Sequence, residues 1–508
     1  MLKKRGLPIP LKSVIIAILI LVQFCLVVFP LIYLWKSALW FYELCGVIAA
    51  VFSIYIISRE GNPSYKMAWV VLILLFPILG ICVFLLFGGG RVFPHLKRKM
   101  AKCEKEYFSK LKTDDSEKEK LFSSDLFHAR QADYLSRETG LPIYSGTKIE
   151  YLESGESFFD HLLFELKSAE KYIFIEFFIL ADGFMWDSIK EILVQKAKNG
   201  VEVRIIFDDF GSIGRQGKNF VKELKNSGIK VSVFNPLRPL VDIFMNNRNH
   251  RKIVIIDGIT TFTGGINIGD EYINRLPRFG HWQDCGIMLK GRATDSFVAM
   301  FFSMWEFTTG EKTKIENYFA GVSFEDDGHI LPYCDDPLNG KNPAEGIYMQ
   351  IINTAQNYVY IMSPYLILDS NMKSALKLAA KSGIDVRIIT PSHPDKWYVH
   401  PVTQQSYGEL LSSGVKIYEY TPGFIHSKVF LSDDKIATIG SVNMDYRSFY
   451  FHFECGVWES GSCCNSAIKN QFNELFEKSK EITEKEWKNR PLFQKIKQMV
   501  LHIFSPFM

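Results

Sequence analysis

Two stretches of the sequence follow one template: His250-Arg-Lys252-Ile-Val-Ile-Ile-Asp257 and His426-Ser-Lys428-Val-Phe-Leu-Ser-Asp433. In each, a Lys stands two residues after the His, and an Asp follows an apolar run. Alternate residues of a β-strand point to the same face, so each His and its Lys are expected to project together into one site. The apolar residues would anchor the strand. Asp257-Gly258 and Asp433-Asp434 are typical of the turn into a returning strand.

A second shared element follows each template. Gly264-Gly-Ile-Asn267 and Gly440-Ser-Val-Asn443 stand at the same distance from their His. Small residues at this position would let backbone N–H groups and the amide of Asn267 or Asn443 approach a phosphate group. One such template alone is weak evidence. Two copies, each followed by the same small motif, strongly indicate a duplicated phosphate-handling site.

The chain around the templates is also duplicated. Residues 197–206 (Ala-Lys-Asn-Gly-Val-Glu-Val-Arg-Ile-Ile) align with residues 380–389 (Ala-Lys-Ser-Gly-Ile-Asp-Val-Arg-Ile-Ile), and residues 228–231 align with residues 414–417. Two helix–Gly–strand joins in the same order favour an internal duplication over coincidence. Short β-rich runs alternate with amphipathic helical patterns, which predicts an α/β protein. In the first copy, the expected strands are Tyr172–Leu180, Val201–Phe207 and Ile229–Phe234, and the expected helices are Asp187–Asn199 and Gln216–Ser227.

The composition is that of a folded protein with one unusual end. Of 508 residues, 47% are hydrophobic and 22% are charged, which excludes a disordered, collagen-like or disulfide-scaffold chain. Residues 1–92 carry eight Lys or Arg and two Asp or Glu, whereas the remainder carries 51 basic and 53 acidic residues. A nearly neutral body argues against a general nucleic-acid binder, which needs a basic footprint. The nine cysteines form no C-x-x-C pattern, so reduced thiols and no zinc site are expected.

Three apolar runs in the basic N-terminal region are long enough to cross the hydrocarbon core of a membrane. They are Val14–Leu34, Leu39–Ile57 and Ala68–Phe87. The first exceeds the apolar length of a signal peptide, and no small-residue cleavage site follows it. Basic residues at 3–12 and 91–102 favour a cytoplasmic location for both ends of the region. Three full spans do not satisfy this condition, so either one run is interfacial or re-entrant, or the N-terminus lies outside despite its charge. The last two runs are predicted to form a spanning pair, and the first to span or to lie in the interface.

These observations divide the chain into five parts. Residues 1–92 are predicted to form a transmembrane helical region, and the polar residues 93–135 a helical or loose linker. Residues 136–325 and 326–486 are predicted to form two similar domains, and residues 487–508 an amphipathic tail. Five apolar residues of the tail fall on one face of a helix, which suits either an anionic lipid surface or packing on the protein body. They are Leu492, Ile496, Met499, Val500 and Ile503.

With these motifs the chain resembles the phospholipase D superfamily and, within it, the bacterial cardiolipin synthases. Besides the templates, the resemblance rests on segments along nearly the whole chain: Asn62–Trp69, Ile175–Phe178, Asp208–Ser212, Gly264–Tyr272, Asn443–Phe449, Glu454 and Arg490–Lys497. None of the template positions departs from the superfamily pattern. The resemblance implies two phospholipase D-like α/β lobes, each a mixed sheet flanked by helices. They would pack about a pseudo-twofold axis between the two His/Lys pairs.

The residue types at the predicted site suit phosphodiester chemistry. A neutral imidazole escapes the repulsion that an anionic nucleophile meets at a phosphodiester, and a second imidazole can protonate the leaving alkoxide. An ordinary imidazole pKa of about 6.5 would let one ring be neutral and the other charged near neutral pH. Lys252 and Lys428 would neutralise developing charge, and Asn267 and Asn443 would add hydrogen-bond donors. No metal or other cofactor is therefore required.

The resemblance further implies the reaction and the individual roles. Two phosphatidylglycerol molecules would give cardiolipin and glycerol through a phosphohistidine, with His250 as the nucleophile and His426 as the acid and base. Asp257 and Asp433 are expected to fix the turn and the Lys geometry rather than to transfer protons. Glu454 would either orient an imidazole or be a solvated strand carboxylate. The expected partners are phosphatidylglycerol and the anionic bilayer of a bacterial cell membrane, with no nucleic acid; no oligomeric state is predicted.

Other functions remain open from the sequence. A hydrolase with water as the acceptor and a membrane-tethered nuclease would use the same templates. Intact templates disfavour a scaffold, and the apolar runs carry no ionisable cluster beyond Glu43, which disfavours a transporter. A membrane location would concentrate lipid and exclude water, which favours transfer over hydrolysis. The histidines outside the templates at positions 281, 393 and 400 are expected to be structural or exposed.

Overall fold

The computed structural model describes residues 39–88, 94–112, 115–236, 246–325 and 327–507. The chain divides into two compact units. The first consists of residues 1–94 with the short segment 237–246, and the second consists mainly of residues 95–236 and 247–506. The apolar run Val14–Leu34 lies outside the described residues.

The first unit contains helices α2 (Leu39–Ser58), α3 (Pro63–Leu75) and α4 (Pro77–Val83), followed by the π-helical turn η1 (Phe84–Gly88). The run Ala68–Phe87, predicted as one continuous span, is instead divided. The backbone leaves helical geometry at Phe76, and Pro77, which lacks an N–H group, begins a new helix. Within the described residues, no helix combines the length and the apolar character that a membrane crossing requires.

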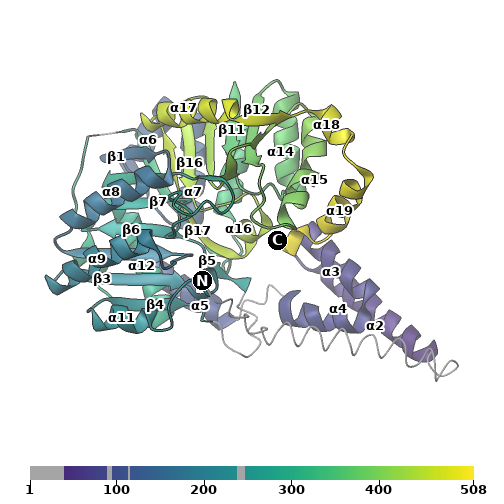
Figure 1. Ribbon diagram of the computed structural model, residues 1–508, viewed down its shortest axis with the longest axis horizontal. Helices are drawn as coiled ribbons and strands as arrows, with labels where there is room; N and C mark the ends of the chain where they lie inside the picture. Colours follow the sequence, from purple (N-terminus) through teal and green to yellow (C-terminus); the bar gives the residue numbers. More distant parts are fainter. Residues whose placement is uncertain (1–38, 89–93, 113–114, 237–245, 326, 508) are drawn as a thin grey trace. The chain divides into compact units, whose positions relative to one another are not determined.

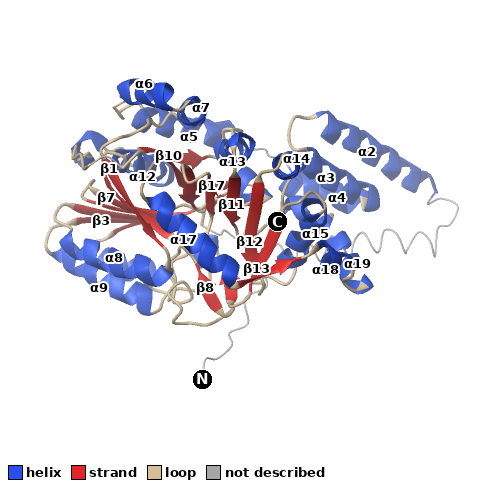
Figure 2. Ribbon diagram, turned by 90° about the horizontal axis from the view of Figure 1, so that it is seen from above, coloured by secondary structure: helices blue, strands red, loops and turns tan. Residues whose placement is uncertain are grey.

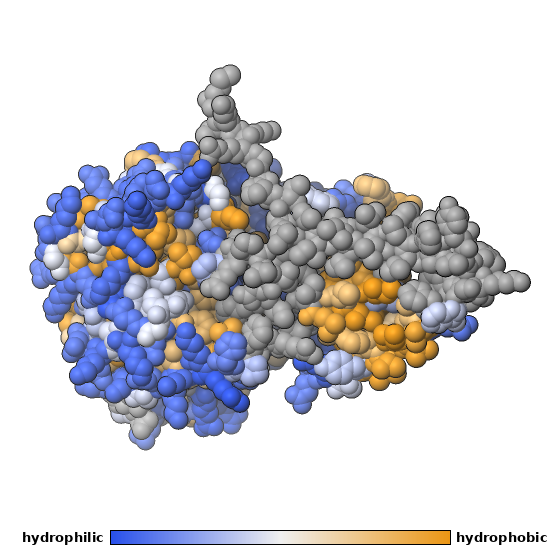
Figure 3. Space-filling view, turned by 90° about the horizontal axis from the view of Figure 1, so that it is seen from below, coloured by the Kyte–Doolittle hydropathy of each residue, from blue (hydrophilic) through white to orange (hydrophobic). Residues whose placement is uncertain are grey.

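The first unit leaves many apolar side chains exposed around a small core. The core includes Ala49, Trp69 and Ile73. Figure 3 shows hydrophobic residues gathered over this unit. Its exposed apolar residues are Trp40, Leu44, Val47, Ile48, Val51, Ile54, Tyr55, Ile57, Met67, Leu74, Leu75, Phe76 and Leu85. Exposed apolar surface of this kind is typical of a site of contact with a membrane or with another protein.

The second unit begins with three helices in the region where a helical or loose linker is predicted. Asp125 starts the third helix by accepting two backbone N–H groups, and Gly140, with a φ of +77°, ends it. The Tyr107 hydroxyl donates to Glu306 of the first lobe at 2.7 Å, and Leu135 joins the core of the second lobe. The helices therefore pack on both lobes. They are α5 (Pro94–Phe108), α6 (Asp115–Ser124) and α7 (Leu126–Thr139).

The first lobe contains a seven-stranded mixed sheet in the order β1-β9-β7-β6-β2-β3-β4. Strands β2, β3 and β4 are parallel, as the alternating pattern predicts, and the pairs on the other side of β2 are antiparallel. The strands are β1 (Thr147–Leu152), β2 (Tyr172–Phe177), β3 (Glu202–Asp208), β4 (Lys230–Phe234), β5 (Arg248–Asn249), β6 (Lys252–Ile256), β7 (Thr260–Gly264), β8 (His281–Gln283) and β9 (Gly286–Gly291). The helices are α8 (Gly155–Ser168), α9 (Phe184–Lys198), α10 (Asp209–Ser212), α11 (Phe220–Asn226), α12 (Thr294–Thr309) and η3 (Ile315–Tyr318).

The second lobe repeats this order as β10-β17-β16-β15-β11-β12-β13 and extends it by β18. The strands are β10 (His329–Asp335), β11 (Tyr358–Met362), β12 (Asp385–Pro391), β13 (Lys416–Tyr420), β14 (Gly423–Ile425), β15 (Val429–Ser432), β16 (Ile436–Gly440), β17 (His452–Ser460) and β18 (Ser479–Ile482). The helices are α13 (Pro343–Thr354), α14 (Ser370–Lys381), α15 (Val399–Leu411), α16 (Tyr446–Tyr450), α17 (Cys464–Glu477), α18 (Glu484–Lys488), α19 (Leu492–His502) and η4 (Ser505–Phe507).

The matching strand orders confirm the internal duplication and the two-lobed α/β fold. Figure 1 shows both sheets with their covering helices, and Figure 2 shows α8 and α9 side by side along the first sheet. Within the first lobe the predicted helix Gln216–Ser227 is shorter, because Asp182 accepts the Gly217 N–H at 2.7 Å and holds the preceding residues in a loop. Each template thus lies on a central strand, β6 or β15, with its apolar residues buried.

Candidate active site

Each template begins at the junction of the two lobes, where a strand of the opposite lobe holds it. β5, just before His250, pairs in parallel with the start of β17, and β14, just before His426, pairs in parallel with β8. The His250 N–H donates to the Phe453 carbonyl at 2.8 Å, and the His426 N–H donates to the Gln283 carbonyl at 2.6 Å. The two backbones therefore meet the opposite lobe before each template enters its own sheet.

A carboxylate from the opposite lobe holds each imidazole. His250 Nδ1 lies 2.9 Å from both carboxylate oxygens of Glu454, and His426 Nδ1 lies 2.6 Å from Asp284 Oδ2. All four side chains are buried, and His250 and His426 expose only 6% and 7% of their surface. Because each Nδ1 faces a carboxylate, it carries the ring proton, and Nε2 is left to attack or to accept a proton. The site is built from two imidazole–carboxylate pairs, each of which spans both lobes.

Glu454 and Asp284 occupy equivalent places, yet sequence analysis identified only Glu454. Asp284 directly follows β8, which pairs with β14, and Glu454 directly follows the two residues of β17 that pair with β5. A Cβ atom at Gly265 would lie 2.2 Å from Asp284 Oδ1, so a side chain there would displace the carboxylate. At the equivalent position, Ser441 donates from its hydroxyl to Glu454 Oε2. The two small motifs differ at this position, with Gly265 in one and Ser441 in the other. This difference in the sequence accompanies the change of carboxylate from Asp284 to Glu454.

The template lysines lie beside the imidazoles. Lys252 Nζ donates to the His250 carbonyl at 2.6 Å, and Lys428 Nζ donates to the His426 carbonyl. Both lysines are buried, and burial lowers the pKa of Lys252 to about 7 and the pKa of Lys428 to about 8. Each ammonium is therefore fixed at the backbone carbonyl of its template His, and both titrate near neutral pH.

The imidazole pKa values differ from the sequence expectation of one neutral and one charged ring. Burial and then the charges of Lys252 and Lys428 lower the pKa of His250 well below its ordinary value. Burial and the charge of Lys428 lower the pKa of His426 to about 4. Burial alone would raise the pKa of Asp284, but His426 and Lys428 lower it below its usual value. Both rings are therefore neutral at pH 7 until a bound anion stabilises an imidazolium.

Asp257 and Asp433 lie at the far end of their strands from the imidazoles. Asp257 accepts three backbone N–H groups, from residues 170–172, at 2.7, 2.7 and 2.8 Å. Asp433 accepts the N–H groups of residues 356–358 at 2.7, 2.8 and 3.0 Å. Both have positive φ angles, 53° and 55°, which the turn requires. The two side chains join each template to the start of the neighbouring strand and do not contact the imidazoles.

The two asparagines differ in their partners. Asn267 Oδ1 accepts the Ile179 N–H at 3.1 Å, and its Nδ2 donates to the Tyr272 hydroxyl at 2.8 Å. Asn443 is also buried, but its Oδ1 accepts no hydrogen bond from the described residues. Asn267 thus supports the site through its neighbours, whereas Asn443 retains a polar atom that a substrate could engage.

A third imidazole, His452, adjoins the first pair. Its ring centre lies 5.3 Å from that of His250, and its Nδ1 lies 3.5 Å from Glu454 Oε1. Within the described part of the chain, one group of three possible metal ligands lies close enough together to hold a metal ion. It consists of His250, His452 and Glu454. Arg447 donates to His452 Nε2 at 3.3 Å, and Glu454 already holds His250. A metal ion would have to displace these bonds beside two lysines, so the arrangement does not favour one.

The lysine pKa values predict the alkaline side of the pH profile. We expect kcat/KM to fall as pH rises through about 7 to 8, because Lys252 and Lys428 lose the charge that attracts a phosphodiester. Burial lowers the pKa of each ammonium, so each loses its charge at a lower pH than an exposed lysine does. The rate is therefore expected to fall as the pH rises. Initial rates at constant ionic strength across this range measure the effect. A rate that stays constant to about pH 9.5 would show that neither lysine titrates as the structure indicates.

The sequence matches a protein family in both lobes. Residues 162–305 and 348–478 match the family described as "Cardiolipin synthase, PLD-like domain". The chain belongs to the cardiolipin synthase family. Residues 47–89 of this family member also match "Phospholipase_D-nuclease N-terminal". Of the two matched segments of the first family, one contains His250 and the other contains His426.

Relatives of this cardiolipin synthase family member extend over nearly the whole chain. A cardiolipin synthase of Halalkalibacterium halodurans is 32% identical over 475 residues, which are 92% of this chain and 94% of the relative. Cardiolipin synthase 2 of Bacillus cereus is 34% identical over 465 residues, or 91% and 90% of the two chains. An uncharacterized protein of Streptococcus mutans is 39% identical over 464 residues, or 90% and 99%.

A solved structure shares the fold of this cardiolipin synthase family member. The crystal structure of phosphatidylserine synthase from Haemophilus influenzae has a TM-score of 0.54 at 14% sequence identity. The match covers 74% of this chain and 98% of that structure. At this identity the likeness concerns the fold alone, and it agrees with the two-lobed α/β arrangement.

Proposed function

We propose that this protein transfers a phosphatidyl group from one phosphatidylglycerol to a hydroxyl of a second, which gives cardiolipin and free glycerol. The observation that carries the proposal is the presence of two imidazole–carboxylate pairs that cross between the lobes, His250 with Glu454 and His426 with Asp284. Two imidazoles at one site supply a nucleophile and an acid for one phosphodiester. Family membership supports phosphatidylglycerol as the substrate.

The chemistry proceeds by two displacements at phosphorus. In the first, His250 Nε2 attacks the phosphorus, the bond from phosphorus to the glycerol oxygen breaks, and protonated His426 gives its Nε2 proton to that oxygen. In the second, the hydroxyl of another phosphatidylglycerol gives its proton to His426 Nε2, and its oxygen displaces His250 from phosphorus. Lys252 and Lys428 balance the charge on the phosphoryl oxygens. One ester bond is exchanged for another, so no nucleotide is consumed.

The surroundings of the two rings support His250 as the nucleophile and His426 as the acid and base. Asp284 is ionised and makes a 2.6 Å bond to His426, which stabilises an imidazolium when the anionic substrate is bound. Glu454 is shared between His250, His452 and the Ser441 hydroxyl. A shared carboxylate stabilises a charged His250 less, which suits a neutral nucleophile.

We further propose that residues 1–92 hold the enzyme in a bacterial cell membrane, with the body on the cytoplasmic side. The apolar runs, the exposed apolar side chains of α2 and α3, and the basic residues at 3–12 and 91–102 support this location. Phosphatidylglycerol would then reach the site from the bilayer. The limited access of water at such a surface favours a lipid hydroxyl as the acceptor.

Reconstitution tests the reaction directly. Purified full-length protein in vesicles of pure phosphatidylglycerol, with a chelator and without nucleotide, is expected to form cardiolipin and glycerol in equal amounts. Added glycerol should drive the reaction backwards, because one ester bond is exchanged for another and the reaction lies near equilibrium. Mass spectrometry of the lipids and an enzymatic glycerol assay measure both products, and the His250→Ala protein is the matched control.

The other outcomes distinguish the alternative functions. Phosphatidic acid in place of cardiolipin would identify water as the acceptor and the protein as a hydrolase. Activity that appears only with a CDP-linked lipid would contradict attack by His250 on phosphatidylglycerol. Cleavage of labelled nucleic acid by the same preparation, with the lipids unchanged, would support a nuclease.

A further inference from the structure

Helix α19 turns an apolar face outward. The five residues that the sequence places on one helical face are exposed, four of them in α19 and Ile503 directly after it, and so is Phe493. Phe493 exposes 77% of its surface and Leu492 exposes 72%. This face therefore does not pack on the described part of the second unit. The sequence leaves two interpretations of this face open. The exposed fractions speak against the one in which the face packs on the protein body.

The opposite face fixes the helix to the second lobe. Gln498 is buried, and its amide donates to Gln404 of α15 at 3.1 Å. Leu501 packs against an apolar cluster that includes Val402, and Arg490 donates to Gln498 Oε1 at 2.6 Å. Specific contacts therefore set the rotation of α19 about its axis and direct its apolar face away from the lobe.

The segment of chain that carries this face has only positively charged side chains. Residues 487–508 contain Lys488, Arg490, Lys495 and Lys497 but no Asp or Glu. At about 100° per residue, Lys495 and Lys497 lie on opposite flanks of the apolar face. A helix with a Leu, Ile, Met and Phe centre and basic flanks is typical of a segment that lies in the interface of an anionic bilayer. Charge complementarity thus favours anionic lipid over another apolar protein surface.

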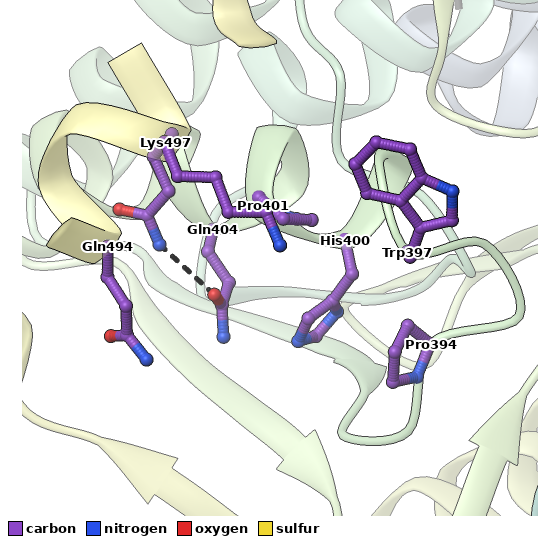
Figure 4. Close-up of a pocket in the computed structure, with 8 residues that line it drawn as sticks. Pro394, Trp397, His400, Pro401, Gln404, Gln494 and Lys497 are labelled. Atoms are coloured by element: carbon purple, nitrogen blue, oxygen red, sulfur yellow. Dashed lines mark hydrogen bonds between the residues drawn. The ribbon is translucent and has the colours of Figure 1, made fainter. Parts of the chain in front are cut away.

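The apolar surface continues onto the loop before α15. Trp397 exposes 69% of its surface, Tyr398 is also exposed, and Lys497 Nζ lies 5.6 Å from the centre of the Trp397 ring. A cavity of about 340 Å³ is lined by Trp397, His400 and Lys497, among others. Figure 4 shows the side chains that line it. Aromatic rings and lysines together suit the level of the lipid head groups, where each side chain has an apolar body and a polar end.

The same loop leads to the candidate active site. Lys396, the residue before Trp397, contributes to the lowered pKa of His250. Leu501 of α19 shares its apolar cluster with Tyr446 of α16, the helix that follows Asn443. One loop and one core cluster therefore join the outward face of α19 to the residues around the imidazoles.

We propose that α19, with Trp397 and Tyr398, is a lipid-docking surface that places the second lobe on an anionic bilayer. The proposal rests on the proposed function, because a phosphatidyltransferase must take both of its substrates from the bilayer. Apolar side chains enter the acyl boundary, Lys495 and Lys497 meet the lipid phosphates, and the cavity beside Trp397 gives a head group room next to Lys497.

Photocrosslinking of the full-length protein tests the occupant of this face. Phe493 is replaced by the photoreactive p-benzoylphenylalanine, and the protein is reconstituted in vesicles of phosphatidylglycerol and phosphatidylcholine. Phe164 of α8, which exposes 70% of its surface, is replaced in the same way as the matched control. Irradiation is expected to join lipid to position 493 at least about tenfold more than to position 164, because only the docked face meets acyl chains.

Each other product would overturn the proposal. A crosslink from position 493 to residues 39–88 would show that the protein's own first unit covers the face. A crosslinked pair of chains would show that a second copy covers it, and equal lipid labelling at 493 and 164 would show that the bilayer does not prefer the face of α19. The same labelling in the His250→Ala background is expected to give the lipid adduct without turnover, so a failure of docking and a failure of the proposed reaction are distinguished.

Substitutions supply a second test. Phe493→Ser combined with Ile496→Ser is expected to lower cardiolipin formation on vesicles about tenfold, and Phe164→Ser should not. Lys495→Gln and Lys497→Gln are each expected to lower it about fivefold on vesicles rich in phosphatidylglycerol. The loss should be much smaller with dispersed short-chain phosphatidylglycerol. An equal loss in both assays would show that the helix stabilises the fold instead of docking lipid.

Discussion

Replacement of His250 or of His426 by Ala is expected to lower cardiolipin formation by at least about four orders of magnitude. In the proposed reaction each imidazole performs a step that the other cannot take over, because each is held by its own carboxylate at a fixed place. Rates are measured with labelled phosphatidylglycerol in vesicles. Thermal unfolding and membrane recovery provide the control, since both variants should remain folded.

The two substitutions can also be told apart. With a phosphatidyl ester of p-nitrophenol, the leaving group needs no proton, so His426→Ala should still release nitrophenol in a first turnover. His250→Ala should release none, because no nucleophile attacks. The reverse pattern would exchange the two roles. A rate above a few per cent of the unsubstituted protein for either variant with phosphatidylglycerol would contradict a site shared by both rings.

The second large effect is expected at the carboxylates. Asp284→Asn and Glu454→Gln should each lower the rate by about two to four orders of magnitude, with little loss of stability. An amide donates where the carboxylate accepts, so the imidazole loses the partner that keeps its proton on Nδ1. Vesicle rates and unfolding curves measure the two effects separately.

Asp295→Asn is the matched control for the carboxylates. Asp295 lies in the first turn of α12 and interacts with Tyr172, whose N–H donates to Asp257 at the far end of the template strand from His250. Its substitution should change the rate by less than about threefold, as for ordinary sites away from the chemistry. If Asp284→Asn or Glu454→Gln retained about a tenth of the original rate or more, the crossed pairs would not orient the imidazoles.

The fold was largely predictable because the sequence patterns that indicate it are short and occur twice. The two templates, the two small motifs and the two helix–Gly–strand joins each occupy equivalent strands, and the sheets have the same order. The Ala68–Phe87 run was predicted less well. Hydropathy shows that these residues are apolar. It does not show that one helix ends before Phe76 and that another begins at Pro77.

The site was predictable only in part, because its remaining contacts depend on how the lobes meet. His250 and His426 share a recognisable template, but Asp284 is an isolated Asp directly after a short strand, and only the pairing of β8 with β14 places it at His426. The imidazole pKa values were also misjudged, because burial and two neighbouring lysines are tertiary properties. Asn267 is bonded within the protein for the same reason.

The exchange of carboxylates between the lobes has an evolutionary consequence. In a one-lobed ancestor, two identical chains would have to associate about a twofold axis, and every substitution would appear at both imidazoles at once. Once the copies are joined in one polypeptide, each can change alone. The two carboxylates show such independent changes. Asp284 lies beside Gly265, whereas Glu454 lies beside Ser441. Gene fusion thus allows two equivalent histidines to take different roles, which in the proposed reaction are attack and proton transfer.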